Sequence, residues 1–315
     1  MGLDIRIAYL TIGAVGIVGN LQVSIVMLSY RPLRRRLSNY FLANQCILDL
    51  LLSIIVILMY MVDTSGIVSG VLGELTCRLW YNRSIFLGFF ASSLFSVVAL
   101  TVERYAEIVY PIQHKLRLTR RLVVYSLVVI NLAGVIFKLS ITAPVFAMIN
   151  GVCVGGLFPN SYVKKLAGVL NFCFEFFIPL TIIGYCYVGM VRSMNRRIQP
   201  QASKTWNKAR KGILKTLLFV VLVFVACTTF KQIVTLLYFL DLIAFKGVND
   251  PIFQIPTILA YSNCCLNPLV YFFKYPEFQR GVRWLYCPRR IWNRTNNVTA
   301  YANSDNETKM TTERY

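Results

Sequence analysis

Charged side chains stand inside or at the edge of several long apolar stretches of this sequence. Among them are Asp49, Glu103, Arg104, Glu175 and Lys231. A charge at membrane depth is costly unless it is paired, reaches water or serves a function, so such residues are functional candidates by default. Their types indicate ion pairing, cation binding or ligand recognition.

Catalytic chemistry finds little support in the same sequence. The only histidine is His114, so there is no histidine-based metal cluster or catalytic triad. No glycine-rich phosphate-binding loop is visible. We therefore predict that the chain is not an enzyme.

The composition places these charges in lipid. Of the 315 residues, 57% are hydrophobic and 15% are charged. One soluble core cannot bury that much apolar surface. The formal net charge of +20 suits a membrane protein with basic cytoplasmic loops. The composition predicts a membrane protein that binds no nucleic acid.

Seven apolar runs follow one another, each close to the length that spans a bilayer. They are Ile5–Tyr30, Tyr40–Val62, Ile85–Val102, Leu122–Ile149, Leu166–Met190, Ile213–Leu240 and Ile252–Phe273. None shows the ten-residue alternation of a membrane barrel, so helices must satisfy the backbone groups. We predict an all-α membrane protein, a seven-transmembrane helix bundle. A transporter would be expected to show an internal repeat or paired broken helices, and neither is visible.

The loops after the first, third and fifth runs are rich in lysine and arginine, as in Arg31–Arg36 and Lys115–Arg121. Basic loops remain on the cytoplasmic side, which places the N-terminus outside and the C-terminus inside. We expect residues 1–4 to form a short extracellular segment and residues 5–275 the helix domain. Residues 288–315 are polar and predict a disordered cytoplasmic tail.

A short segment after the last run, residues 276–287, interleaves aromatic and basic side chains. Phe278, Trp284 and Leu285 alternate with Arg280 and Arg283. This pattern predicts an amphipathic helix on the inner leaflet, in contact with membrane lipid. Cys287 at its end is either a palmitoylation site or an unmodified thiol.

Several short motifs in this order and spacing resemble one family. They are Gly19-Asn20, Leu48-Asp49-Leu50, Cys77, Glu103-Arg104-Tyr105, Cys153, Pro179 with Tyr187, and Asn267-Pro268-Leu269-Val270-Tyr271. Each is weak alone, but together they are specific. The chain resembles the rhodopsin-like (class A) G-protein-coupled receptors from about Ile5 to Cys287. Within that family its overall resemblance is to the peptide receptors. The resemblance implies a plasma-membrane receptor that activates heterotrimeric G proteins.

The resemblance also assigns roles near both ends of the third run. Cys77 and Cys153 fall on the oxidising side, where a disulfide is stable, although Cys153 could also be a free thiol. Glu103 is expected to hold Arg104 in the resting state through a charge-assisted pair. Tyr105 completes this inner motif.

The seventh run carries the other half of the implied switch. Pro268 removes a backbone donor, and Asn267 can satisfy the group it frees. In the family mechanism Tyr271 then moves towards Tyr187.

Asp49 lies about midway along an apolar run, so it must be protonated or coordinated. The family places a sodium ion here, with Ser93, Asn263 and Asn267 as the matching oxygen ligands, and oxygen ligands suit a hard cation. The alternative is a carboxyl group that is only hydrogen-bonded to its neighbours.

The sequence departs from the family pattern in two helices. Thr228 and Phe230 stand where relatives usually carry Trp and Pro in the sixth run, and Gly134 replaces a Trp in the fourth. Without proline, the sixth helix is either straight or slightly bent by threonine bonding to its own backbone. Coupling between ligand and this helix cannot be assumed.

Six positions would face the family's ligand pocket: Arg83, Phe86, Glu175, Lys231, Gln232 and Tyr261. Glu175 and Lys231 should either form an ion pair with each other or bind a ligand, and the ion pair is favoured. Lys164 and Lys165 add to a basic rim that suits an acidic or amidated peptide. A peptide is the favoured ligand, and a small molecule or lipid stays open. The alternative function is a receptor-like scaffold that binds arrestin without coupling to a G protein.

Overall fold

The computed structural model describes residues 3–61, 70–196, 204–244 and 250–287, and only the backbone of residues 3, 195, 196, 204–217, 220 and 274. The predicted tail, residues 288–315, lies outside this description. The helices are α1 (Leu3–Ser29), α2 (Arg31–Arg35), α3 (Asn39–Met61), α4 (Gly70–Thr76), η1 (Cys77–Tyr81), α5 (Ser84–Val109), α6 (Pro111–Arg117), α7 (Arg120–Thr142), η2 (Ala143–Val145), α8 (Ser161–Phe172), η3 (Cys173–Phe177), α9 (Ile178–Arg196), α10 (Lys204–Phe239), α11 (Pro251–Lys274) and α12 (Pro276–Tyr286). The strands are β1 (Phe146–Ile149) and β2 (Val152–Gly155).

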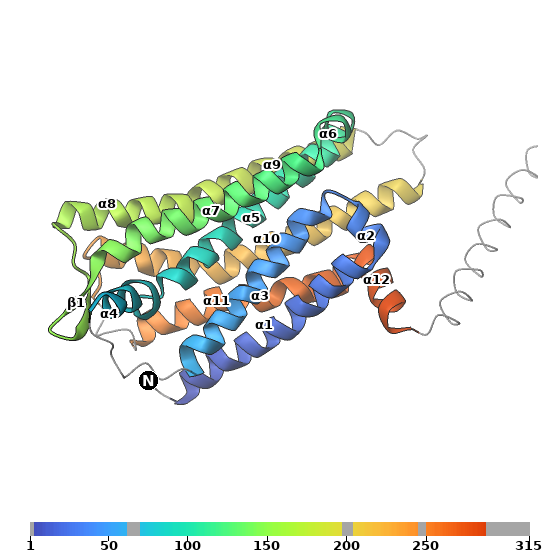
Figure 1. Cartoon of the computed structure of the whole chain (residues 1–315). Helices are drawn as coiled ribbons and strands as arrows, with labels where there is room; N and C mark the ends of the chain where they lie inside the picture. Colours follow the sequence, from blue (N-terminus) through green and yellow to red (C-terminus); the bar gives the residue numbers. More distant parts are fainter. Residues whose placement is uncertain (1–2, 62–69, 197–203, 245–249, 288–315) are drawn as a thin grey trace, which may run out of the picture.

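Long helices run side by side along most of the molecule (Figure 1). Six helical segments of the described chain are long and apolar enough to cross a membrane: Asp4–Ser29, Asn39–Met61, Gly70–Val109, Arg120–Val145, Ser161–Met194 and Val221–Phe239. α11 is the seventh long helix, and it carries buried polar side chains such as Gln254 and Asn263. The predicted all-α bundle is confirmed.

α12 lies at the end of the bundle opposite β1 and continues from α11 after a turn (Figure 1). Its Phe278 is fully buried and packs edge-to-face against Phe272, while Arg36 forms an ion pair of 2.8 Å with Glu277. These contacts hold the short helix against the bundle.

The end that carries Cys77 and Cys153, called the disulfide end below, is closed by a hairpin that the sequence analysis missed. The fourth apolar run was expected to be helical to Ile149, but α7 ends at Thr142. Pro144 follows in a 3-10 turn, because proline cannot continue the helical hydrogen bonding. β1 and β2 then pair antiparallel around Asn150 and Gly151, both at positive φ, as a tight hairpin turn requires.

The hairpin is attached to the helix that precedes α5. Cys153 on β2 is disulfide-bonded to Cys77, with the Cα atoms 5.5 Å apart. The backbone N–H of Met148 donates to Glu74 Oε2 at 2.8 Å, and Glu74 also pairs with Arg78 at 2.6 Å. The disulfide implied by the resemblance is present.

Proline in α11 is accommodated by a neighbour that differs from the expected one. Pro268 has no N–H to donate to the carbonyl of Cys264, four residues earlier. Asn20 on α1 donates its Nδ2 to that carbonyl at 2.9 Å. Asn267, expected to serve this role, instead donates to Asp49 Oδ2 at 2.8 Å. Asn20 therefore satisfies the freed group, and Asn267 is committed to the centre of the bundle.

α10 passes through the positions of Thr228 and Phe230 as one unbroken helix. The hydroxyl of Thr228 donates to the carbonyl of Phe224 at 2.7 Å, and that of Thr229 to Val225 at 2.6 Å. Such bonds to the preceding turn bend helices slightly. The two threonines therefore bond to the backbone within the same turn as Phe230, the position at which relatives have a proline.

Candidate functional site

A cavity of about 530 Å³ opens near the disulfide end between α5, α7, η3, α10 and α11; we call it the ligand cavity. Its lining includes five of the six positions expected to face a ligand: Arg83, Glu175, Lys231, Gln232 and Tyr261. Cys153 and aromatic side chains such as Phe146 and Phe239 complete an apolar wall. The cavity therefore combines a large apolar surface with a few buried charges, as small-ligand sites do.

Phe86 is not part of the lining. It is 1% exposed and packs behind the cavity, with its ring 4.3 Å from that of Tyr261 and 6.3 Å from that of Phe90. The aromatic ring of Tyr261 reaches the cavity and covers Phe86. Phe86 therefore supports the cavity floor rather than facing a ligand.

Glu175 makes a different ion pair from the one that the sequence favoured. Its Oε1 lies 2.7 Å from Nζ of Lys138 on α7, and its Oε2 accepts from Gln232 at 3.0 Å. Lys138 also donates to Asn171 Oδ1. Glu175 belongs to η3, a π-helical turn, and such turns often occur at functional sites. The carboxylate of Glu175 thus bonds to side chains of both α7 and α10.

Lys231 is left without this partner. Its Nζ finds no hydrogen-bond partner among the described side chains, although only 7% of the residue is exposed. The ammonium lies 4.3 Å from the ring centroid of Phe90 and 5.7 Å from that of Tyr261. Cation–π contacts offset part of the burial cost but leave N–H donors unused.

Arg83 approaches the cavity from the start of α5. Its backbone is left-handed, at φ 58°, between the π-helical η1 and α5, and its guanidinium lies 5.4 Å from the ring centroid of Tyr60. Left-handed backbone is strained for a residue with a side chain, and such strain clusters at functional sites. This conformation places a cation at the side of the cavity.

The basic rim is weaker than the sequence suggested. Lys164 forms an ion pair with Asp241 and lies 4.6 Å from the ring centroid of Tyr238. The hydrogen bond from Lys164 holds the pKa of Asp241 below its usual value. Lys164 is therefore neutralised locally, whereas Lys165 stays exposed.

Asp49 lies at the centre of the bundle and is 1% exposed. Its Oδ1 accepts from the hydroxyl of Ser93 at 2.8 Å and its Oδ2 from Asn267 at 2.8 Å. Gln45, one turn earlier on α3, also donates to both oxygens, at 3.1 and 3.2 Å, and to Ser93 Oγ at 2.6 Å. Gln45 is not among the residues predicted for this site, although its spacing of four from Asp49 puts both on one helix face.

Three of the buried side-chain oxygens that lack a donor in the described part of the chain bear on this site, and two of them belong to residues that bond to this carboxylate, Gln45 and Asn267. Oδ1 of Asn263, Oδ1 of Asn267 and Oε1 of Gln45 have no hydrogen-bond partner among the described residues, and all three are buried. Buried acceptors without a donor are costly. The oxygen set expected for sodium, with Asp49 and Ser93, therefore fits a hard cation chemically.

Arg104 has three partners at the opposite end of α5. Its Nη1 lies 2.6 Å from Glu107 Oε2, its Nη2 donates to Asn39 Oδ1 at 3.2 Å, and its Nε lies 3.5 Å from Glu103. The guanidinium is almost fully buried. The expected neighbour Glu103 is thus the most distant of the three, and Glu107, one turn along the same helix face, was overlooked.

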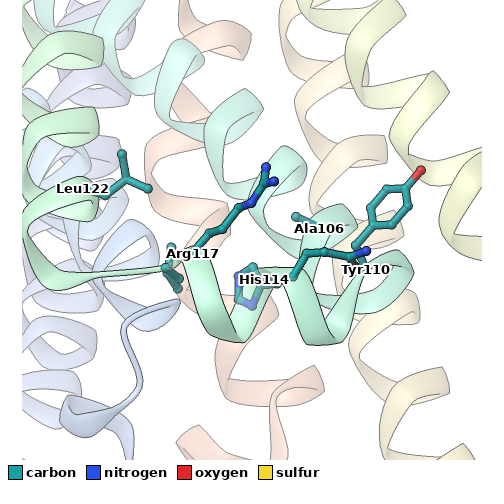
Figure 2. Close-up of a pocket in the computed structure, with 7 residues that line it drawn as sticks. Ala106, Tyr110, His114, Arg117 and Leu122 are labelled. Atoms are coloured by element: carbon teal, nitrogen blue, oxygen red, sulfur yellow. The ribbon is translucent and has the colours of Figure 1, made fainter.

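Glu103 has a closer partner in the following loop helix. His114 Nε2 lies 2.9 Å from Glu103 Oε1. Figure 2 shows His114 and Arg117 on α6, beside a second cavity of about 460 Å³ that Tyr110 and Leu122 also line. The only histidine of the chain therefore connects α6 to the end of α5.

Of the three tyrosines of the implied switch, Tyr105 and Tyr187 pack against the same apolar pair, Ile108 and Met190, whereas Tyr271 lies in a different cluster. Tyr105 packs against Tyr110 and Tyr185, each with ring centroids 6.0 Å away, rather than against Arg104. Tyr187 packs beside Ile108 and Met190, whereas Tyr271 belongs to a different apolar cluster, and its hydroxyl has no hydrogen-bond partner in the described part of the chain. Tyr187 and Tyr271 do not meet.

Comparison of the sequence with known protein families agrees with this architecture. Residues 19–271 match the model of the 7 transmembrane receptor (rhodopsin family). The chain is 25% identical over 308 residues to neuromedin-U receptor 2 of Mus musculus, covering 93% of this chain and 77% of that one. It is 27% identical over 293 residues to somatostatin receptor type 4 of Rattus norvegicus, covering 90% and 73%.

A relative of another kind matches at a similar level. Melanopsin of Podarcis siculus is 27% identical over 292 residues, which cover 87% of this chain and 60% of the melanopsin. Similarity at this level extends to receptors with different names, so it identifies the family and not the ligand. Because the family model covers most of the sequence, this chain belongs to the rhodopsin family of seven-transmembrane receptors.

Proposed function

We propose that the chain is a receptor that binds an extracellular peptide in the ligand cavity and activates a heterotrimeric G protein. The observation that carries this proposal is the arrangement along α5, which borders the cavity through Arg83 at one end and holds the restrained Arg104 at the other. Relatives named as neuromedin-U, somatostatin and galanin receptors support a peptide as the ligand. The family supports a plasma-membrane location, and the basic loops support an orientation with the disulfide end outside.

Activation requires that Arg104 be released from the residues that hold it. Glu107 and Asn39 restrain the guanidinium directly, while His114 occupies the carboxylate of Glu103. In this mechanism a ligand shifts α10 and α11, Tyr271 moves towards Tyr187, and Arg104 turns to the G protein. A ligand achieves this only if it binds the released arrangement more tightly than the restrained one.

The G-protein part is tested by nucleotide exchange in membranes that contain the receptor and a panel of Gα subunits, challenged with a peptide library. We expect peptide-stimulated exchange in wild type and none in Arg104→Ala at equal surface expression. Arg34→Ala is the matched control, because that arginine is exposed on α2 at the same end of the bundle. Exchange that persists in Arg104→Ala, or arrestin recruitment with no exchange at all, would favour the scaffold alternative.

A sodium ion at Asp49 is part of the proposal, held by the carboxylate with oxygens of Ser93, Asn263 and Asn267. A bound sodium would neutralise the buried carboxylate and stabilise the arrangement that surrounds it. Gln45 Nε2 already donates to three of the oxygens that a cation would use. The amide of Gln45 and sodium therefore compete for the same oxygens.

Replacing this amide should strengthen the sodium effect. We expect the stabilisation of Gln45→Leu by sodium chloride, relative to N-methylglucamine chloride, to exceed that of wild type by about 1.4 kcal/mol, the value of a tenfold gain in affinity at saturation. Thermal unfolding of purified receptor in the two salts measures it. Asp49→Asn, which lacks the charge, should show no sodium effect. An equal sodium effect in wild type and Gln45→Leu would show that the amide does not compete.

Two further parts of the proposal concern the end of the chain. Cys287 caps α12 and is partly exposed, in a position where a palmitate could enter the bilayer. Arrestin is a further partner in this proposal and would bind the polar tail, residues 288–315, which lies outside the described residues.

A further inference from the structure

Lys231 lines the ligand cavity, and its ammonium has no hydrogen-bond partner among the described residues. An ammonium has three N–H donors, and the rings of Phe90 and Tyr261 satisfy it only through weak cation–π attraction. Burying a charge without a hydrogen-bonded counter-ion is unfavourable. The residue is nevertheless 93% buried, since its exposed fraction is 7%.

The charges that line the cavity do not balance. The described lining has three cations, Arg83, Lys138 and Lys231, and one carboxylate, Glu175. That carboxylate lies 2.7 Å from Lys138 and accepts from Gln232. Arg83 is partly exposed, so water can solvate it, whereas Lys231 is 7% exposed and its Nζ has no hydrogen-bond partner in the described part of the chain. The lining therefore lacks one negative charge to balance the ammonium of Lys231.

We infer that the ligand supplies this charge as a carboxylate, which enters the cavity between Lys231 and Arg83 with an apolar group beside it. This inference rests on the proposed function, because it takes the cavity as the ligand site. A monoanion matches one buried ammonium, and Phe146, Phe158 and Phe239 provide apolar surface for the neighbouring group. A positively charged ligand would be repelled, and an amidated peptide terminus could not neutralise Lys231.

The test uses the full chain in lipid nanodiscs and pairs of probes that differ in one charge. N-acetyl-leucyl-phenylalanine is compared with its C-terminal amide, and dodecanoate with dodecanol, by the shift that each causes in thermal unfolding. We expect an acid to bind at least about tenfold more tightly than its neutral pair, the lower end of what a charge-assisted hydrogen bond contributes. Lys231→Met should remove this preference, and Lys231→Arg should retain it.

A shift with the peptide acid identifies a peptide carboxylate, and a shift with dodecanoate identifies a lipid acid; either supports the inference. Equal binding of acid and neutral probes, no shift with any acid, or an acid preference that survives in Lys231→Met would overturn it. Lys231→Gln serves the same purpose if the Met variant does not fold. No G protein is present, so a failure of G-protein activation does not affect this result. Conversely, a cationic peptide that stimulated nucleotide exchange would contradict the inference that the ligand supplies a carboxylate, and it would still support the proposed receptor function.

Discussion

Alanine in place of Gly134 is expected to prevent normal packing of α7 against α5. A Cβ at this position would lie 2.4 Å from the backbone nitrogen of Ser92 and 2.5 Å from its Cα. Backbone atoms cannot move aside as a side chain can, so the helices would have to separate. Overpacking of this kind costs about 1–3 kcal/mol and sometimes more.

Separation of the two helices would also break polar contacts between them. The hydroxyl of Ser92 donates to the carbonyl of Asn131 at 2.7 Å, and Asn131 donates to Asn44 on α3 at 2.9 Å. Small residues permit such close approach of membrane helices and the hydrogen bonds that it allows. We therefore expect Gly134→Ala to reduce surface expression and the unfolding temperature, and Gly134→Trp, which restores the residue common in relatives, to abolish folding.

Gly184→Ala is the matched control, because that glycine is also helical and nothing lies within 4 Å of an added Cβ. Removing a helical glycine should be neutral or stabilising by about 0.5–1 kcal/mol. A second control is the double variant Gly134→Ala with Ser92→Gly. It should not recover, because the clash is with backbone atoms that glycine retains. Recovery would show that the Ser92 side chain limits the approach.

Apolar runs were sufficient to predict the bundle but not its boundaries. Burial in lipid imposes helices on any such run, whereas the end of α7 depends on Pro144 and on the hairpin that Asn150 and Gly151 permit. The contact between Gly134 and Ser92 was equally hidden, because sequence spacing within one helix does not report the distance to another.

Pairings between charges were the least predictable part of the site. Glu175 was recognised as a buried charge, yet Lys138, which stands in an apolar run as Lys231 does, was passed over. Both lysines lie within reach of the cavity, and only the relative rotation of α7 and α10 decides which ammonium meets the carboxylate. The same holds for His114 and Glu103, which are 11 residues apart on different helices. Residue type identified the participants, but tertiary packing selected the partners.

The partner choice of Glu175 gives the second large expected effect. Glu175→Gln keeps an acceptor for Gln232 but leaves the ammonium of Lys138, which is 5% exposed, without a counter-ion. Removing one member of a buried ion pair costs about 3–5 kcal/mol. We expect a correspondingly large fall in the unfolding temperature of the purified, ligand-free receptor.

Removing the second charge should recover most of this loss. In Glu175→Gln with Lys138→Met both charges of the ion pair are gone, so neither is left buried without its partner. Asn171 Oδ1 is the acceptor that loses its donor. A double-mutant cycle between positions 175 and 138 should therefore give a coupling free energy of about 3 kcal/mol, near the upper range for contacting residues. The parallel cycle between 175 and 231 should give a smaller value, because Lys231 interacts with Glu175 without a salt bridge. A larger coupling with Lys231 would assign the carboxylate to that lysine and would remove the free cation on which carboxylate recognition depends.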